Sequence, residues 1–201
     1  MLTLTNKPYN SVLVKADSQE ELGNTFIRFQ EHYESPNPKF RNQIFTLGEF
    51  KSWYSIEYGS NYVTDWTGFN FPSRVLESFR HGLFDPLTNE ESNLLNLLKY
   101  RHDNFYVIGA QDETTLKHEL THALYATNDK YKSEIDNVLD KNRKKISKTY
   151  NHLLKMGYTK EVIYDEIQAY TIDGDTNFIW EYLDLNTIRK IQEIYQRYKI
   201  N

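Results

Sequence analysis

Two histidines and a glutamate stand within five residues, His118-Glu119-Leu120-Thr121-His122, and match the pattern H-E-x-x-H. Residues four apart lie on one face of an α-helix, so the imidazoles of His118 and His122 can bind the same metal ion. Glu119 lies about 100° round the helix from His118, where its carboxylate can take a proton from a water bound to that metal. The motif therefore predicts a Zn²⁺ site with Glu119 as general base.

A catalytic zinc usually has three protein ligands, so one more must come from elsewhere in the chain. The metzincin pattern H-E-x-x-H-x-x-G-x-x-H is excluded, because Tyr125 and Asn128 stand where it needs Gly and His. The chain has no cysteine, which leaves a carboxylate on a later helix. We expect Glu166 to be the third ligand, with Asp165 and Asp173 as alternatives.

The motif segment, residues 114–128, has the features of a buried helix. Asp112, Thr114 and Thr115 can each cap its start. The strand expected just before it, Asn104–Gly109, is rich in aromatic and β-branched residues and closes with glycine. Four apolar residues recur at helical spacing within the segment: Leu116, Leu120, Ala123 and Leu124.

A second helix must bring Glu166 to the histidines. The segment 160–173 is helical in pattern, Thr159 can cap its start and Gly174 can end it. Its apolar side chains are suited to packing on the motif helix: Val162, Ile163, Ile167 and Tyr170.

Length and composition restrict the kinds of protein that this chain can be. At 201 residues, of which 15% are aromatic, it is long enough for one substantial core and is not disordered. The net charge of -4 gives no electrostatic case for nucleic-acid binding. No run of apolar residues approaches the length of a membrane span, and no cleavable signal is recognisable. We therefore expect a cytoplasmic protein that does not interact with membranes.

The first sixty residues predict alternating strands and helices. A short strand is expected at Ser11–Lys15, followed by a helix with a capping box of Ser18 and Glu21 that runs to about Tyr33. A second strand is expected at residues 43–46. Thr46 and Glu49 form another capping box before the next helix.

The segment Gly59–Ser73 mixes aromatic residues with Gly, Asn and Asp and has no sustained period. We interpret it as an ordered loop packed by its own rings, with the lining of a substrate cleft as the alternative. A short helix is expected at residues 73–81. A longer one opens with Thr88 and Glu91 and runs to about residue 101.

The C-terminal third predicts helices only. Residues 131–157 form one helix or two, and residues 177–201 form two more. A basic run lies in the first of these segments, and we interpret it as a solvated helix face, with an acidic partner or a nucleic acid as alternatives. Its members are Lys141, Arg143, Lys144, Lys145 and Lys148.

With its HELTH motif and the downstream DEIQAY at residues 165–170, the chain resembles zincin metallopeptidases of the gluzincin type between about residues 104 and 175. The resemblance implies a single zincin-like domain over 1–201 with an α+β fold. A small mixed sheet would pack on the motif helix in an α/β part, about 1–128, and a mainly helical part, about 129–201, would supply Glu166. Many gluzincins have an Asp four residues after the third ligand. This chain has Tyr170 there, and Asp173 is the expected substitute for orienting a histidine.

The resemblance also implies a zinc metallopeptidase that acts on a peptide or protein substrate. Tyr158, Tyr164 and Tyr170 are candidates to stabilise the oxyanion. His102 and His152 are expected to be ordinary polar residues. The alternative is a non-catalytic peptide- or protein-binding scaffold whose zinc site is structural or vestigial.

Overall fold

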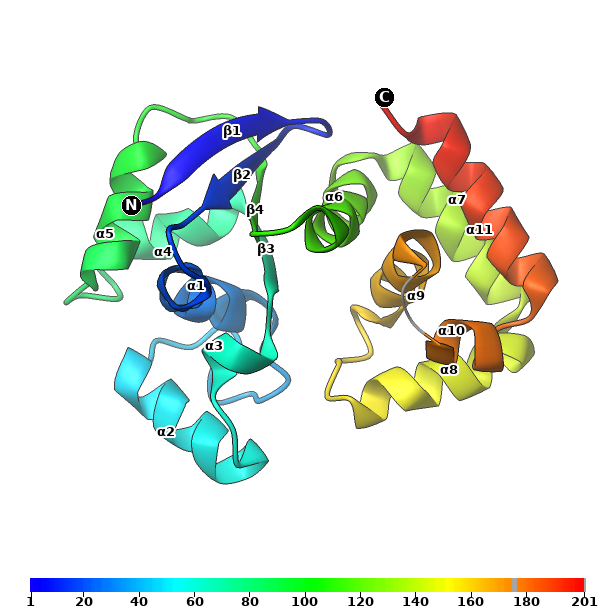
Figure 1. Cartoon of the computed structure of the whole chain (residues 1–201), viewed down its shortest axis with the longest axis horizontal. Coiled ribbons are helices and arrows are strands. Elements are labelled where there is room, and N and C mark those ends of the chain that lie inside the picture. The colour runs from blue at the N-terminus through cyan, green and yellow to red at the C-terminus, as the bar shows by residue number, and fades with distance from the viewer. Residues whose placement is uncertain (175–176, 201) are drawn as a thin grey trace. The chain divides into compact units, whose positions relative to one another are not determined.

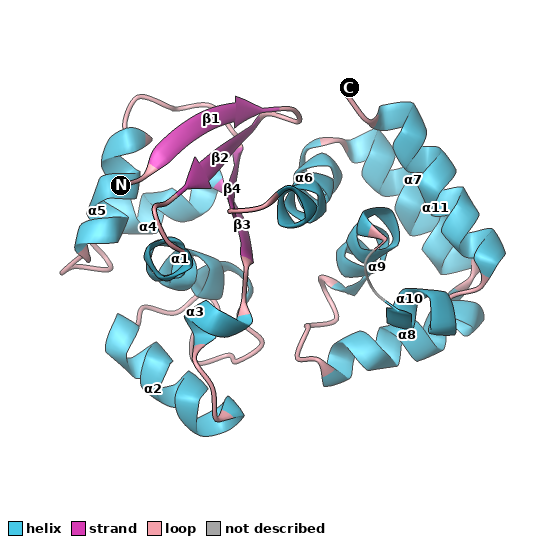
Figure 2. Cartoon of the chain, in the orientation of Figure 1, coloured by secondary structure: helices cyan, strands magenta, loops and turns pink. Residues whose placement is uncertain are grey.

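The computed structural model describes residues 1–174 and 177–200 and has an α+β fold, as expected (Figures 1 and 2). The chain divides into two compact units, Met1–Glu119 and Leu120–Asn201, and the division falls within the motif helix α6 (Glu113–Thr127). The strands all lie in the first unit. Among the described residues, none of the helices has the length and apolar character needed to cross a membrane.

The sheet of the first unit has four strands in the order β1-β2-β4-β3, with mixed directions. β2 and β4 are parallel at its centre, β1 pairs with β2 in an antiparallel hairpin, and β3 is antiparallel to β4. The sequence analysis did not predict β1, an edge strand whose side chains are largely exposed. The strands are β1 (Thr3–Lys7), β2 (Ser11–Lys15), β3 (Gly68–Pro72) and β4 (Tyr106–Ala110).

Helix α1 (Gln19–Glu34) packs on this sheet. Ser18 caps it as expected, since its side chain accepts a hydrogen bond from the main-chain N of Glu21. Gly109 does not close β4, which continues to Ala110. A Cβ at Gly109 would lie 2.8 Å from the ring of Phe26, so the glycine lets α1 approach the sheet closely.

The core of the first unit is dominated by phenylalanine. The rings of Phe29 and Phe79 are 3.8 Å apart between centroids, and those of Phe79 and Phe84 are 4.0 Å apart. Beside them lies a buried ion pair in which Arg28 Nε donates to Glu91 Oε1 at 2.6 Å. The buried phenylalanines are Phe26, Phe29, Phe40, Phe45, Phe50, Phe69, Phe71, Phe79, Phe84 and Phe105.

The predicted strand at residues 43–46 is wrong, because this segment is a turn and a short connection into α2 (Leu47–Tyr58). Asn42 has a positive φ of 57°, and the main-chain N of Gln43 donates to the carbonyl of Phe40. The side chain of Phe45 packs edge-on against that of Phe40. Its apolar character therefore reflects the aromatic core and not strand pairing.

The interpretation of Gly59–Ser73 as a loop is also wrong in part. Residues Tyr62–Asp65 form α3, and β3 follows as an edge strand of the sheet. Phe69 and Phe71 alternate with Asn70 along β3, and all three side chains are buried. The alternation covers only three residues of a five-residue strand, which is too short to predict a strand from the sequence.

The remaining helices of the first unit agree with the sequence analysis. Thr46 with Glu49 and Thr88 with Glu91 form reciprocal capping boxes. The helix expected at residues 73–81 begins as a 3₁₀ turn. These elements are η1 (Ser73–Val75), α4 (Leu76–Arg80) and α5 (Asn89–Leu97).

The second unit is helical, and α11 packs against both α7 and α9 (Figure 1). The segment 129–157 forms two helices that separate at Asn142. The predicted cap at Thr159 is wrong: α9 begins after Val162, which provides no side-chain hydrogen bond, and Gly174 ends the helix as expected. The helices are α7 (Asp129–Lys141), α8 (Arg143–Lys155), α9 (Ile163–Asp173), α10 (Asn177–Tyr182) and α11 (Leu185–Tyr198).

The two helices predicted for residues 177–201 correspond to α10 and α11, and Asn201 lies outside the described residues. The basic run lies at the end of α7 and along α8, and all five of its side chains are exposed. Arg143 pairs with Asp140 at 2.8 Å, and Lys145 approaches Asp184 at 3.7 Å.

Candidate metal centre

Helix α6 positions the two histidines. Its start is fixed by Asp112, whose Oδ1 accepts hydrogen bonds from the main-chain N atoms of Thr114 and Thr115, both at 2.9 Å. Of the three capping residues considered, Asp112 therefore has this role. Ala123 and Leu124 are buried on α6, so the helix is held by its apolar face.

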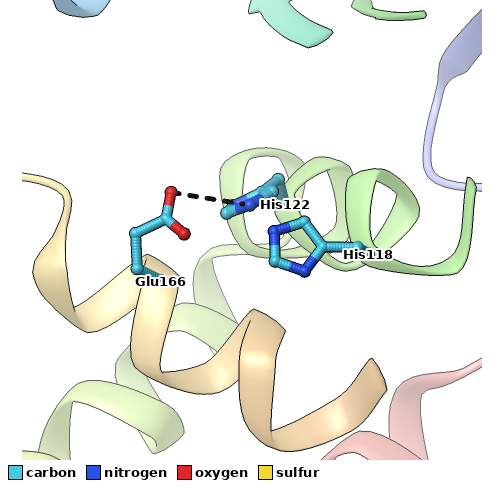
Figure 3. A group of neighbouring side chains, drawn as sticks. All are labelled: His118, His122 and Glu166. Atoms are coloured by element: carbon cyan, nitrogen blue, oxygen red, sulfur yellow. Dashed lines mark ion pairs between the residues drawn. The ribbon is translucent and has the colours of Figure 1, made fainter. Parts of the chain in front are cut away.

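His118, His122 and Glu166 form a compact group of possible metal ligands (Figure 3). One ligand atom from each residue can be chosen so that all three atoms lie within 4.8 Å of one another. His122 and Glu166 are 3% and 7% exposed, and Nε2 of His122 lies 3.7 Å from Oε1 of Glu166. The structure thus brings together the three residues expected to hold zinc.

These residues fit a divalent cation. Ligand atoms bound to zinc at ~2.0–2.1 Å in tetrahedral geometry are about 3.3 Å apart, close to the 3.7 Å between His122 and Glu166. Two imidazoles and one carboxylate are also a donor set that zinc accepts in catalytic sites, where a fourth position is left for water.

Asp165 orients His122. Its Oδ1 lies 2.8 Å from Nδ1 of His122. A neutral imidazole that donates from Nδ1 carries its lone pair on Nε2, the nitrogen nearer to Glu166. Asp165, an alternative metal ligand in the sequence analysis, therefore occupies the position expected for a residue that fixes a ligand's tautomer.

Asp165 is itself held by a buried glutamine. Nε2 of Gln168 donates to Oδ1 of Asp165 at 2.8 Å, and Oε1 of Gln168 accepts from the hydroxyl of Tyr131 at 2.7 Å. Gln168 and Tyr131 are fully buried. The chain of contacts from Tyr131 to His122 joins α7, α9 and α6 and fixes the ring plane of a metal ligand.

Glu119 is buried at 5% exposure, and its carboxylate is bound by the sheet of the first unit. Oε2 of Glu119 accepts a hydrogen bond from Nδ2 of Asn70, on β3, at 2.7 Å. The amide of Asn70 is fixed in turn by the hydroxyl of Tyr106, which donates to its Oδ1 at 2.6 Å. The proposed base is thus anchored in a buried network.

The three candidate oxyanion tyrosines lie in different surroundings. The hydroxyl of Tyr164 donates to Oδ1 of Asp140 at 2.9 Å in an exposed contact. The hydroxyls of Tyr158 and Tyr170 lie 2.7 Å from each other. Tyr170 follows Glu166 by one helical turn and so lies on the same face of α9. This placement favours the Tyr158 and Tyr170 pair over Tyr164.

The remaining candidates are not members of the group formed by His118, His122 and Glu166. His102 is exposed in the connection before β4, and the ring of His152 packs against Tyr182 on its edge. Asp173 is the last residue of α9, and Asp165 makes a contact that orients His122.

Sequence reasoning missed the hydrogen bonds that Asn70 and Gln168 make within the site. Gln168 carried a recognisable signal, since it follows Asp165 by three positions and shares its helix face. Asn70 lies on an unpredicted strand, and the sequence held no signal for it.

Comparison with known proteins does not add to this description. No family model, curated sequence or solved structure matches the chain.

Proposed function

We propose that the chain is a zinc-dependent metallopeptidase with a zincin-like fold. The observation that carries this proposal is the group of His118, His122 and Glu166, whose ligand atoms lie within 4.8 Å of one another beside the glutamate of the motif. Support for the fold comes from the order of β4, α6 and α9 along the chain, in which the last helix contributes the carboxylate.

Zn²⁺ held by His118, His122 and Glu166 would act as a Lewis acid and lower the pKa of water to about 7. Asp165 keeps His122 in the tautomer that presents Nε2. Glu119 is the general base: it accepts a proton from the attacking water as the oxygen bonds to the scissile carbonyl carbon. It then gives that proton to the leaving nitrogen as the C–N bond breaks, so its charge is restored at the end of the cycle.

The test compares the wild-type chain with Glu119→Gln. Both proteins are assayed for metal content by mass spectrometry and for cleavage of a mixed peptide library by detection of new termini. We expect one zinc per chain in both proteins, and only a small residual rate of cleavage in Glu119→Gln, because the amide cannot act as a base. His118→Ala is expected to lose both the metal and cleavage.

Two results would count against this function. If Glu119→Gln cleaves peptides at the wild-type rate, Glu119 is not the general base. Stoichiometric zinc in a wild-type chain that cleaves no peptide would indicate the binding scaffold instead.

A further inference from the structure

The carboxylate of Glu119 lies against β3, next to Gly68 and Asn70. Gly68 and Asn70 are two residues apart and so face the same side of the strand. A Cβ at Gly68 would lie 2.1 Å from Oε1 of Glu119, closer than any real contact allows. Gly68 is not among the glycines with positive φ, so the space it leaves, and not its backbone, explains its identity.

Asn70 holds the other oxygen of the carboxylate. Its Nδ2 donates to Oε2 of Glu119 at 2.7 Å, and its main-chain N donates to Oε1 of Gln30 at 3.1 Å. The hydroxyl of Tyr106 donates to Oδ1 of Asn70, which turns the NH₂ group toward Glu119. Asn70 and Tyr106 are 7% and 3% exposed, so neither hydrogen bond is weakened by competing solvent.

The two carboxylate oxygens of Glu119 have different neighbours. Oε2 has a fixed donor, whereas Oε1 occupies the space that a Cβ at Gly68 would fill and accepts no hydrogen bond from Asn70. A base that must take a proton and return it needs a fixed direction and one oxygen left for the transfer.

We propose that Asn70 is a positioning residue for Glu119, that Gly68 leaves the space that Oε1 occupies, and that Tyr106 sets the orientation of the Asn70 amide. This inference rests on the proposed function, because it assigns a role relative to the general base. The alternative is that the network only satisfies a buried carboxylate and contributes to stability.

Kinetic measurements on Asn70→Ala and Gly68→Ala distinguish these roles. We expect kcat to fall roughly 10- to 100-fold in each variant, with KM and zinc content unchanged, because a displaced base affects the chemical step alone. Gly48→Ala is the matched control: a Cβ at Gly48 meets nothing within 4 Å, so kcat should equal that of the wild-type chain.

Tyr106→Phe keeps the ring and removes only the hydroxyl, so it tests the network without a cavity. We expect a smaller fall in kcat than in Asn70→Ala. Tyr54→Phe is its control, since the hydroxyl of Tyr54 donates to Oδ2 of Asp65 at 3.0 Å and accepts from Nε1 of Trp66 at 3.1 Å. Equal kcat values for Tyr106→Phe, Asn70→Ala and the wild-type chain would overturn the proposal.

A double-variant cycle separates positioning from stability. In the Glu119→Gln background, Asn70→Ala should cause no further loss of residual activity, because Asn70 acts through Glu119. An additional loss of the same size as in the wild-type background would show that Asn70 acts independently and would overturn the proposal.

Thermal unfolding of the same cycle separates this inference from the proposed function. The shift in Tm of the double variant should be smaller than the sum of the single shifts, which would show that the contact exists in solution. Additive shifts would overturn the positioning proposal even in an active enzyme. If the shifts are non-additive and the wild-type chain cleaves no peptide, the contact exists but has no catalytic role, and the proposed function is overturned with it.

Discussion

Oδ1 of Asp165 lies 2.8 Å from Nδ1 of His122, one residue before the carboxylate that faces the other nitrogen of the same ring. Adjacent residues of α9 thus contact one histidine in two ways: Glu166 lies 3.7 Å from Nε2, where the two could hold a metal together, and Asp165 fixes the tautomer. The two carboxylates have different tasks because successive side chains on a helix point about 100° apart.

Asp165→Asn should weaken zinc binding by about 10- to 100-fold, because the group that accepts from Nδ1 of His122 loses its negative charge and no longer raises the basicity of the ring. Competitive titration with a fluorescent chelator would measure the change. Asp140→Asn is the control, since Asp140 is exposed and pairs with Arg143 and Tyr164. An affinity within twofold of the wild-type value would show that Asp165 does not tune the site.

Zinc should stabilise the folded chain, since the ligands converge only in the folded state. At 100 times the dissociation constant the expected gain in unfolding free energy is ~2.7 kcal/mol. Differential scanning calorimetry with zinc and with EDTA would measure it. Glu166→Gln should reduce the difference between the two scans, and an undiminished difference would mean that Glu166 is not a ligand.

The buried pair of Arg28 and Glu91 should be sensitive to loss of one charge. Both side chains are almost fully buried, at 4% and 0% exposure, so Glu91→Gln leaves a buried guanidinium without its counter-charge. We expect the free energy of unfolding to fall by about 3–5 kcal/mol, measured by urea denaturation. Glu90→Gln, at a partly exposed position in the same helical turn, should change it by less than about 0.5 kcal/mol.

Glu31 should make stability depend on pH. Burial raises the pKa of its carboxyl from an ordinary 4.5 to about 7, although hydrogen bonds with Ser35 and Tyr62 lower it in part. Between those values the folded chain keeps a proton that the unfolded chain has lost, so the free energy of unfolding falls as pH rises from about 4.5 to about 7 and then levels off. The total contribution is roughly 3 kcal/mol.

Glu31→Gln removes this titration and keeps a hydrogen-bonding group of the same size. Relative to the wild-type chain, the variant should gain stability between pH 5 and pH 8, as measured by urea denaturation at both values. A stability difference between the two proteins that does not change with pH would show that Glu31 has an ordinary pKa in the folded chain.

The histidine pair was predictable because its spacing matches the helical period, a local property of the sequence. Glu166 was predictable for a related reason: its segment had a helical pattern that ended at Gly174, and the structure places its carboxylate with the histidines. The capping boxes of α2 and α5 are equally local, because donor and acceptor are three residues apart.

The polar partners of the site depend on tertiary structure. Asn70 meets Tyr106, 36 positions later, only because β3 pairs with β4 in one register, and a shift by one residue would turn Asn70 to the other face. The strand itself was hidden because its Phe-Asn-Phe alternation covers only three residues. The error at Thr159 has a similar origin: α9 begins with a main-chain turn, in which the N of Val162 donates to the carbonyl of Thr159 at 3.2 Å.

The missing side-chain cap at Val162 has a consequence for the backbone of α9. The first turn of this helix contains Asp165 and Glu166, whose negative charges are stabilised by the positive end of the helix dipole. Both carboxylates are directed to His122. A cation that joins Glu166 to the histidines would therefore restrain the amide groups of this turn. Slower hydrogen–deuterium exchange there on addition of zinc would report metal occupancy from the main chain, with no substrate required.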